Sequence, residues 1–172
     1  PKERLDAAVR VLDEALADEL LEAVRGAGPR RFEALAVALL VAMGYGRGDA
    51  VRGLVTGRPG DGRVDGVVNE DALGLDAVYV QAKCHAPENR VGRPDLQRFI
   101  GSMTGEGATK GVFVTTSTFT AEAKDLVARL SQRIVLIDGA RLARLMIACN
   151  VGVRTTGVIR VRAIDETRFA DA

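Results

Sequence analysis

Residues 57–83 read GRPGDGRVDGVVNEDALGLDAVYVQAK, and the other predicted elements are arranged around this segment. A glycine-rich turn opens it and leads into a predicted strand at about 63–69 that carries Asp65. The polar segment that follows makes the connection to a second predicted strand at 76–83. Two strands joined by so short a connection are expected to pair as a hairpin, since antiparallel neighbours need no crossover.

The second strand carries a polar pair on one of its faces. Side chains two residues apart on a strand point to the same side, so Gln81 and Lys83 project together. The other side is expected to be buried, because it carries only the apolar residues Val78, Val80 and Ala82. If the strands pair, Asp65 meets Gln81 and Lys83 at one end of the sheet, which suits a divalent metal and an activated water. A hairpin with ordinary polar ends is the competing interpretation.

The rest of the chain alternates helices with short strands. Apolar residues recurring every three or four positions predict helices at 3–25, 29–43, 94–104, 120–130 and 140–149. Apolar runs predict further strands at 51–56, 111–115 and 134–137, and the alternating segment 151–164 predicts an extended tail that forms an edge hairpin. A hairpin followed by strand–helix–strand crossovers predicts an α/β fold, a mixed β-sheet flanked by helices on both faces.

Composition bounds the class of protein. The 172 residues make one domain with a real hydrophobic core, and the net charge of +1 does not by itself indicate nucleic acid. The two cysteines do not suggest a disulfide framework, so a reducing, cytoplasmic location is expected. No stretch has the apolar length of a membrane span, so no membrane partner is expected.

The sequence lacks the motifs of several common kinds of functional site. The glycines at 57–66 lack the GxxxxGK[ST] pattern of a phosphate-binding loop. One histidine and two scattered cysteines cannot build a usual zinc site. A serine hydrolase would need a G-x-S-x-G turn, which has no match here.

What is left is a set of oxygen donors beside one lysine. Asp65 and Gln81 supply a carboxylate and an amide oxygen, and Glu33, at the edge of the apolar face of helix 29–43, could add a second carboxylate. Carboxylates, amide carbonyls and water are the ligands that Mg²⁺ prefers. Lys83 could orient and polarise the attacking water, a chemistry that suits phosphodiester hydrolysis. For Glu33 the alternative is a carboxylate placed near a helix N-terminus by the macrodipole.

Taken together, these residues resemble the Mrr-type restriction endonuclease catalytic domain, of the PD-(D/E)xK nuclease superfamily. The similarity runs in register over roughly residues 5–170. It is carried by the segments Phe32-Glu33, Met43-Gly44-Tyr45-Gly46, GDGRVDG at 60–66, LGLD at 73–76, QAK at 81–83, GVFVTTS at 111–117, VLIDG at 135–139, Leu145-Met146 and NVGV at 150–153.

The resemblance implies roles for individual residues. Asp65 and Gln81 would bind Mg²⁺ (or Mn²⁺), Glu33 would be the helical acid at the metal, and Lys83 would be the catalytic lysine. In this branch Gln commonly takes the place of Glu, so Gln81 is a family trait. DNA contacts are expected at Arg63, Gln97, Thr116 and Ser117. Arg63 replaces the usual glycine of Gly-Asp-Gly-Gly-Ile-Asp-Gly, so it either reaches phosphate or crowds the metal.

The resemblance also implies an activity and an organisation. The activity is metal-dependent cleavage of double-stranded DNA that restricts foreign or methylated DNA. The alternatives are a catalytically silent DNA-binding module, and a repair or junction-resolving nuclease of the same superfamily. Residues 1–28 are expected to form a linker-like helix packed on the catalytic domain of 29–172, without the winged-helix reader that family members carry at the N-terminus. Cutting both strands needs two active sites or two visits, so a homodimer is plausible.

Overall fold

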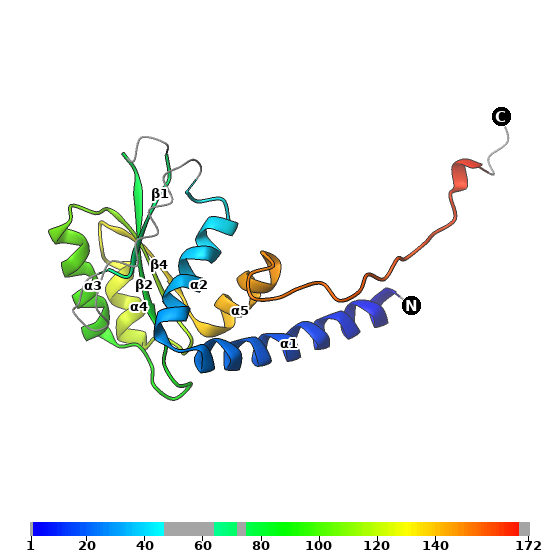
Figure 1. Ribbon diagram of the computed structural model, residues 1–172, viewed down its shortest axis with the longest axis horizontal. Helices are drawn as coiled ribbons and strands as arrows, with labels where there is room; N and C mark the ends of the chain where they lie inside the picture. Colours follow the sequence, from blue (N-terminus) through cyan, green and yellow to red (C-terminus); the bar gives the residue numbers. More distant parts are fainter. Residues whose placement is uncertain (1, 47–63, 72–74, 169–172) are drawn as a thin grey trace.

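The computed structural model describes residues 2–46, 64–71 and 75–168, which form one sheet between two layers of helices (Figure 1). In spatial order its strands are β1 (Gly66–Asn69), β2 (Ala77–Lys83), β3 (Lys110–Thr115) and β4 (Arg133–Ile137). β1 and β2 are antiparallel, whereas β2, β3 and β4 run parallel. The predicted mixed α/β sheet is confirmed. The strand expected at 51–56 lies outside the described residues.

The helices divide between the two faces of the sheet. Their bounds are α1 (Lys2–Ala27), α2 (Pro29–Ala42), α3 (Arg93–Gly105), α4 (Ala121–Ala128) and α5 (Gly139–Ala148), with a short 3₁₀ turn η1 (Glu166–Arg168) in the tail. The crossover helices α3 and α4 cover one face, and α2 and α5 cover the other (Figure 1). Helices on both faces were predicted, and this arrangement buries β3 from both sides, whereas β4 at the edge of the sheet stays partly exposed.

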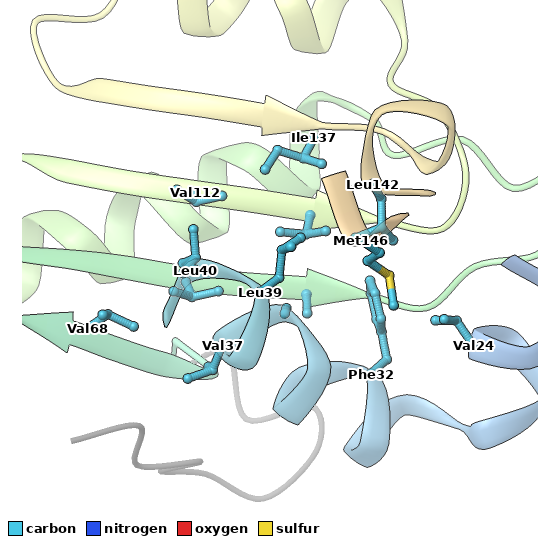
Figure 2. Close-up of a cluster of buried hydrophobic side chains, with 14 of the residues drawn as sticks. Val24, Phe32, Val37, Leu39, Leu40, Val68, Val112, Ile137, Leu142 and Met146 are labelled. Atoms are coloured by element: carbon cyan, nitrogen blue, oxygen red, sulfur yellow. The ribbon is translucent and has the colours of Figure 1, made fainter. Parts of the chain in front are cut away.

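Two hydrophobic cores follow from the alternation of side chains along the strands. On one face, Val80 and Val112 pack against the α2 and α5 residues Phe32, Leu39, Leu40, Leu142 and Met146, several of which Figure 2 shows. On the other face, Phe113 packs beneath α3 and α4, against Leu96, Phe99, Met103 and Ala123. Val78, Val80 and Ala82 are buried in the first core, as their spacing predicted.

The start of α5 ties the ends of β3 and β4 together. The Asp138 carboxylate caps the helix by accepting the Arg141 N–H at 2.9 Å. Next to it, the Gly139 N–H donates to the Ser117 carbonyl at 2.8 Å. A Cβ at position 139 would lie 2.6 Å from the Thr116 carbonyl oxygen, so only glycine permits this close approach. The segment after β3 is therefore held firmly beside α5.

α1 packs on the domain along only part of its length. The predicted apolar stripe is present, and at its inner end Leu20 and Val24 are buried in the core beside α2 and α5. Further out the same stripe is open to solvent, with Val9 44%, Leu12 68% and Leu16 37% exposed. The outer half of α1 projects away from the sheet (Figure 1).

The expectation of an edge hairpin at 151–164 is wrong. These residues contain no strand, and they run as an extended segment that leaves the domain after α5 (Figure 1). Val158, Ile159, Val161 and Ile164 are each between 74% and 79% exposed. Alternating apolar residues form a strand only where a neighbouring strand supplies hydrogen-bond partners, and none of the described strands lies beside this segment.

Within these same described ranges, no helix combines the length and the apolarity needed to cross a lipid bilayer.

Candidate active site

The candidate site lies at the end of the sheet where β2 finishes and β1 begins. Asp65 immediately precedes β1, and its N–H donates to the Val80 carbonyl at 2.9 Å. Its Oδ2 accepts two hydrogen bonds of 2.6 Å, one from Gln81 Nε2 and one from the Ala82 N–H. The predicted meeting of Asp65 and Gln81 is confirmed. Both bonds go to one oxygen, and within the described part of the chain Oδ1 accepts none.

The surroundings of Asp65 disfavour the ionised form of its carboxyl group. Burial raises its pKa from 3.8 to about 6, even though the hydrogen bond from Ala82, the Lys83 charge and the Gln81 amide all favour the ionised form. The Glu33 carboxylate acts in the same direction as burial, because a second negative charge nearby disfavours the first. A positive charge placed beside Asp65 and Glu33 would therefore favour the ionised form of both.

Glu33 reaches this site from the first turns of α2. The helix packs across β1 and β2 through Phe32, Ala36 and Leu40, which fixes the side on which Glu33 emerges. Glu33 itself is only 9% exposed. Burial raises its pKa, and the nearby Arg30 offsets part of that rise. The two carboxylates thus come from a helix and a strand and share one region, as the sequence predicted.

Lys83 ends β2 and turns toward α3. Its Nζ forms an ion pair with Asp95 Oδ1 at 3.3 Å, and the two side chains are 35% and 17% exposed. Burial alone would raise the pKa of Asp95, but the charge and hydrogen bond of Lys83, with smaller help from the Gly92 N–H and Arg98, bring it below its usual range. Lys83 is near enough to Asp65 to favour its ionisation. The predicted grouping of Asp65, Gln81 and Lys83 is therefore present.

The residues expected to contact DNA are placed in different ways. Gln97 is exposed on α3, two residues beyond Asp95. Thr116 and Ser117 are each 3% exposed, and their hydroxyls donate to the carbonyls of His85 and Pro87, at 2.7 and 3.0 Å. A DNA contact from either hydroxyl would require these bonds to open. Arg63 lies outside the described residues.

Asp95 is a member of the site that the sequence patterns did not single out. It stands in the first turn of α3, directly after Arg93 and Pro94, and its carboxylate accepts the N–H of the N-cap residue Gly92 at 3.4 Å. α3 is the crossover helix that follows β2, so its N-terminus returns to the edge where β2 ends. An acid in the first turn of such a helix was the signal that could have found it.

The donor set fits a hard divalent cation. Within the ranges that the structure describes, no group of three or more Asp, Glu, His or Cys side chains forms a metal site. The oxygen donors are instead two carboxylates, Asp65 and Glu33, and the Gln81 carbonyl, whose amide nitrogen is already directed to Asp65. A cation that takes oxygen ligands would remove the mutual repulsion of the two acids. The amide at position 81 adds a ligand without a third negative charge.

The fold is shared with a class of nucleases. The fold matches the solved structure of the DNA modification-dependent restriction endonuclease AspBHI, with a TM-score of 0.58 and 21% identity over 81% of this chain and 37% of that one. It also matches the MspJI restriction endonuclease in complex with a 27-mer oligonucleotide, with a TM-score of 0.60 and 27% identity over 81% of this chain and 33% of the other. The architecture is therefore that of restriction endonucleases.

The family can be stated more narrowly. The restriction endonuclease family model Mrr_cat matches residues 24–146. Over 171 residues the chain is 45% identical to the type IV methyl-directed restriction enzyme EcoKMrr of Escherichia coli K12, a match that covers 98% of this chain and 54% of that enzyme. The chain belongs to the Mrr restriction endonuclease family. It spans about half the length of this curated relative.

Proposed function

We propose that this chain is a metal-dependent endodeoxyribonuclease domain that cleaves modified, foreign double-stranded DNA. The observation that supports it best is the convergence of Asp65, Gln81 and Lys83 at one end of the sheet, with Asp65 Oδ2 held by Gln81 at 2.6 Å. The Mrr family membership and the methyl-directed activity of the Escherichia coli relative favour restriction over repair.

Each residue has a task in this proposal. Asp65, Gln81 and Glu33 would hold Mg²⁺ or Mn²⁺ through their oxygens. Such a cation offsets charge on the scissile phosphate and lowers the pKa of its bound water. Lys83, whose side chain is 35% exposed, would offer its ammonium donors to the attacking water and the phosphate. The Asp65 carboxylate keeps its orientation because the Gln81 amide and the Ala82 N–H hold one of its two oxygens.

A plasmid-nicking assay tests the chemistry. The parent is expected to cut with Mg²⁺ or Mn²⁺ and to stop in EDTA. Lys83→Ala should lower the rate roughly 10²–10⁴-fold, because it removes the ammonium group that assists the attacking water. Lys110→Ala is the matched control, since this lysine pairs with Glu70 and Asp76 at the far end of the sheet.

The outcomes of this assay separate the rival functions. A Lys83→Ala variant that cuts like the parent would rule out the assigned site. A folded parent that binds DNA in a salt-sensitive manner but never cuts would point to a silent binding module. Preference for methylated over plain duplex supports restriction, whereas preference for four-way junctions supports a junction-resolving nuclease.

We also propose that two copies associate through the outer half of α1 and the tail. The exposed stripe of α1 and the exposed tail border a common hollow, which is lined by Leu5, Val9, Val158 and Ile159 among others. A second copy is the proposed occupant, because an assembly with two active sites would cut the two strands of the duplex in a single visit. An apolar surface of this kind is typical of an interface.

Light scattering after gel filtration tests the association. The parent is expected to elute with the mass of a dimer, and Leu12→Glu, in the middle of the exposed stripe, should give a monomer. Leu75→Glu is the control, since Leu75 is 83% exposed but lies beside β2. A parent that is monomeric at every concentration would contradict the proposal.

The location proposed for this domain is the cytoplasm. Cys84 and Cys149 are both free thiols, which suits a reducing compartment.

A further inference from the structure

We propose that Asp95 is a positioning residue that holds the Lys83 ammonium beside the site and keeps it away from the Asp65 carboxylate. The inference rests on the proposed nuclease function and deepens it. It concerns a residue of α3 that neither the strand pattern nor the family motif singles out.

Asp95 is itself firmly placed. It stands in the first turn of α3, and its Oδ2 accepts the Gly92 N–H at 3.4 Å. Its Oδ1 accepts from Arg98 Nη2 at 2.8 Å and lies 3.3 Å from Lys83 Nζ. A carboxylate near a helix N-terminus is also favoured by the macrodipole. Asp95 is the fixed member of the pair with Lys83, and the lysine is the member with the long, flexible stem.

Lys83 has two acids within its range. The first is Asp95, with which it pairs, and the second is Asp65, close enough for the Lys83 charge to favour its ionisation. An ammonium that moved fully onto Asp65 would occupy an oxygen that the cation needs. It would also remove the donor from the attacking water. By holding Nζ on the α3 side, Asp95 leaves the Asp65 oxygens to the cation. The remaining Nζ protons are then available to the attacking water and the substrate.

This arrangement predicts a specific loss in Asp95→Asn. The amide oxygen can still accept the Gly92 N–H, so the start of α3 is preserved, while the charge that holds Lys83 is gone. We expect the affinity for Mn²⁺ without DNA, measured by calorimetry, to fall about 10–100-fold. We expect kcat to fall by a similar factor, with KM for DNA unchanged. Asp95→Glu, which keeps the charge, should recover most of both losses.

Arg98→Gln is the matched control, because Arg98 pairs with the same Asp95 oxygen but its side chain is 68% exposed. It should leave Mn²⁺ affinity and kcat within about twofold of the parent, in contrast to the losses expected of a positioning residue. The inference is overturned if Asp95→Asn keeps the parent's Mn²⁺ affinity and kcat, or if it changes only KM. Equal losses in Asp95→Asn and Arg98→Gln would overturn it as well, since they would indicate a general charge effect.

Failure of the nuclease proposal gives a different result. In that case the folded parent itself neither cuts DNA nor binds Mn²⁺, whichever residue stands at position 95. A parent that cuts and binds Mn²⁺, beside an Asp95→Asn variant that does both equally well, rejects the role of Asp95 alone.

Discussion

Asp65→Asn is expected to abolish cleavage and, at neutral pH, to make the domain more stable. In the proposed mechanism the carboxylate is a metal ligand, so its loss should lower the rate at least as far as in Lys83→Ala. The fold keeps its local contacts, because both hydrogen bonds to this side chain reach one oxygen and the Asn amide oxygen can accept both. The Asn side chain carries no charge, so the repulsion between residue 65 and Glu33 is removed.

The sign of the stability change follows from the pKa of Asp65. Its value is raised from 3.8 to about 6, so the folded state disfavours the ionised carboxylate. Ionisation of Asp65 therefore lowers the free energy of unfolding. This loss of stability is absent below about pH 4, grows between the two pKa values, and is complete above about pH 6. Because solvent reaches part of the carboxyl group and screens it, we expect the substitution to gain about 1–2 kcal/mol at pH 7.5.

Thermal unfolding at two pH values tests this result. Tm of Asp65→Asn should exceed that of the parent by roughly 3–6 °C at pH 7.5 in EDTA and should match it near pH 4. Added Mg²⁺ should raise Tm of the parent only, since a ligand stabilises the state that binds it. A variant that is less stable than the parent at pH 7.5 would show that ionised Asp65 does not destabilise the fold. Residual cleavage by the variant would show that Asp65 is not needed for the reaction.

Phe113→Ala is expected to cost about 3–5 kcal/mol, the usual range for a buried phenylalanine. Phe113 is fully buried in the central strand β3 and makes edge-to-face contacts with Phe99 and Phe119, at centroid distances of 5.4 and 5.8 Å. It lies opposite Gln81 in the register of β2 and β3. Since small domains are stable by about 5–15 kcal/mol, the loss is a large share of the total.

Urea unfolding of the parent and the variant measures this change. The neighbouring strand supplies the control, because Val135 on β4 is 43% exposed and Val135→Ala should cost at most about 1 kcal/mol. A Phe113→Ala variant no less stable than Val135→Ala would mean that the core beneath α3 and α4 is not closely packed.

The sequence predicted the elements whose partners are close along the chain. The two-residue period of β2 placed Gln81 and Lys83 on one face, and the short hairpin connection brought Asp65 beside them. Asp95 could not be placed in this way, because its position depends on the course of the loop between β2 and α3. The family resemblance did not reveal it either, since it pointed to Gln97 instead.

The tail at 151–164 and the apolar stripe of α1 show another limit of prediction from sequence periodicity. Alternating apolar residues at 151–164 predicted a strand, but the pattern contains no information about whether a sheet edge is within reach. The stripe of α1 is equally regular at Val9 and at Val24, yet only its inner end is buried, because α2 and α5 extend no further. Periodicity shows which face is apolar, and the lengths of the neighbouring helices decide how much of it is covered.

The two bonds to Asp65 Oδ2 also bear on how the hairpin finds its alignment. The oxygen accepts the main-chain N–H of Ala82 and the side chain of Gln81, while the N–H of Asp65 donates to Val80. A slip of β1 by one residue would turn its side chains to the opposite face and separate all three partners. These hydrogen bonds of the Asp65 carboxylate form only in the native register of β1 and β2. A hairpin in another register would lose them and, with them, the proposed nuclease centre.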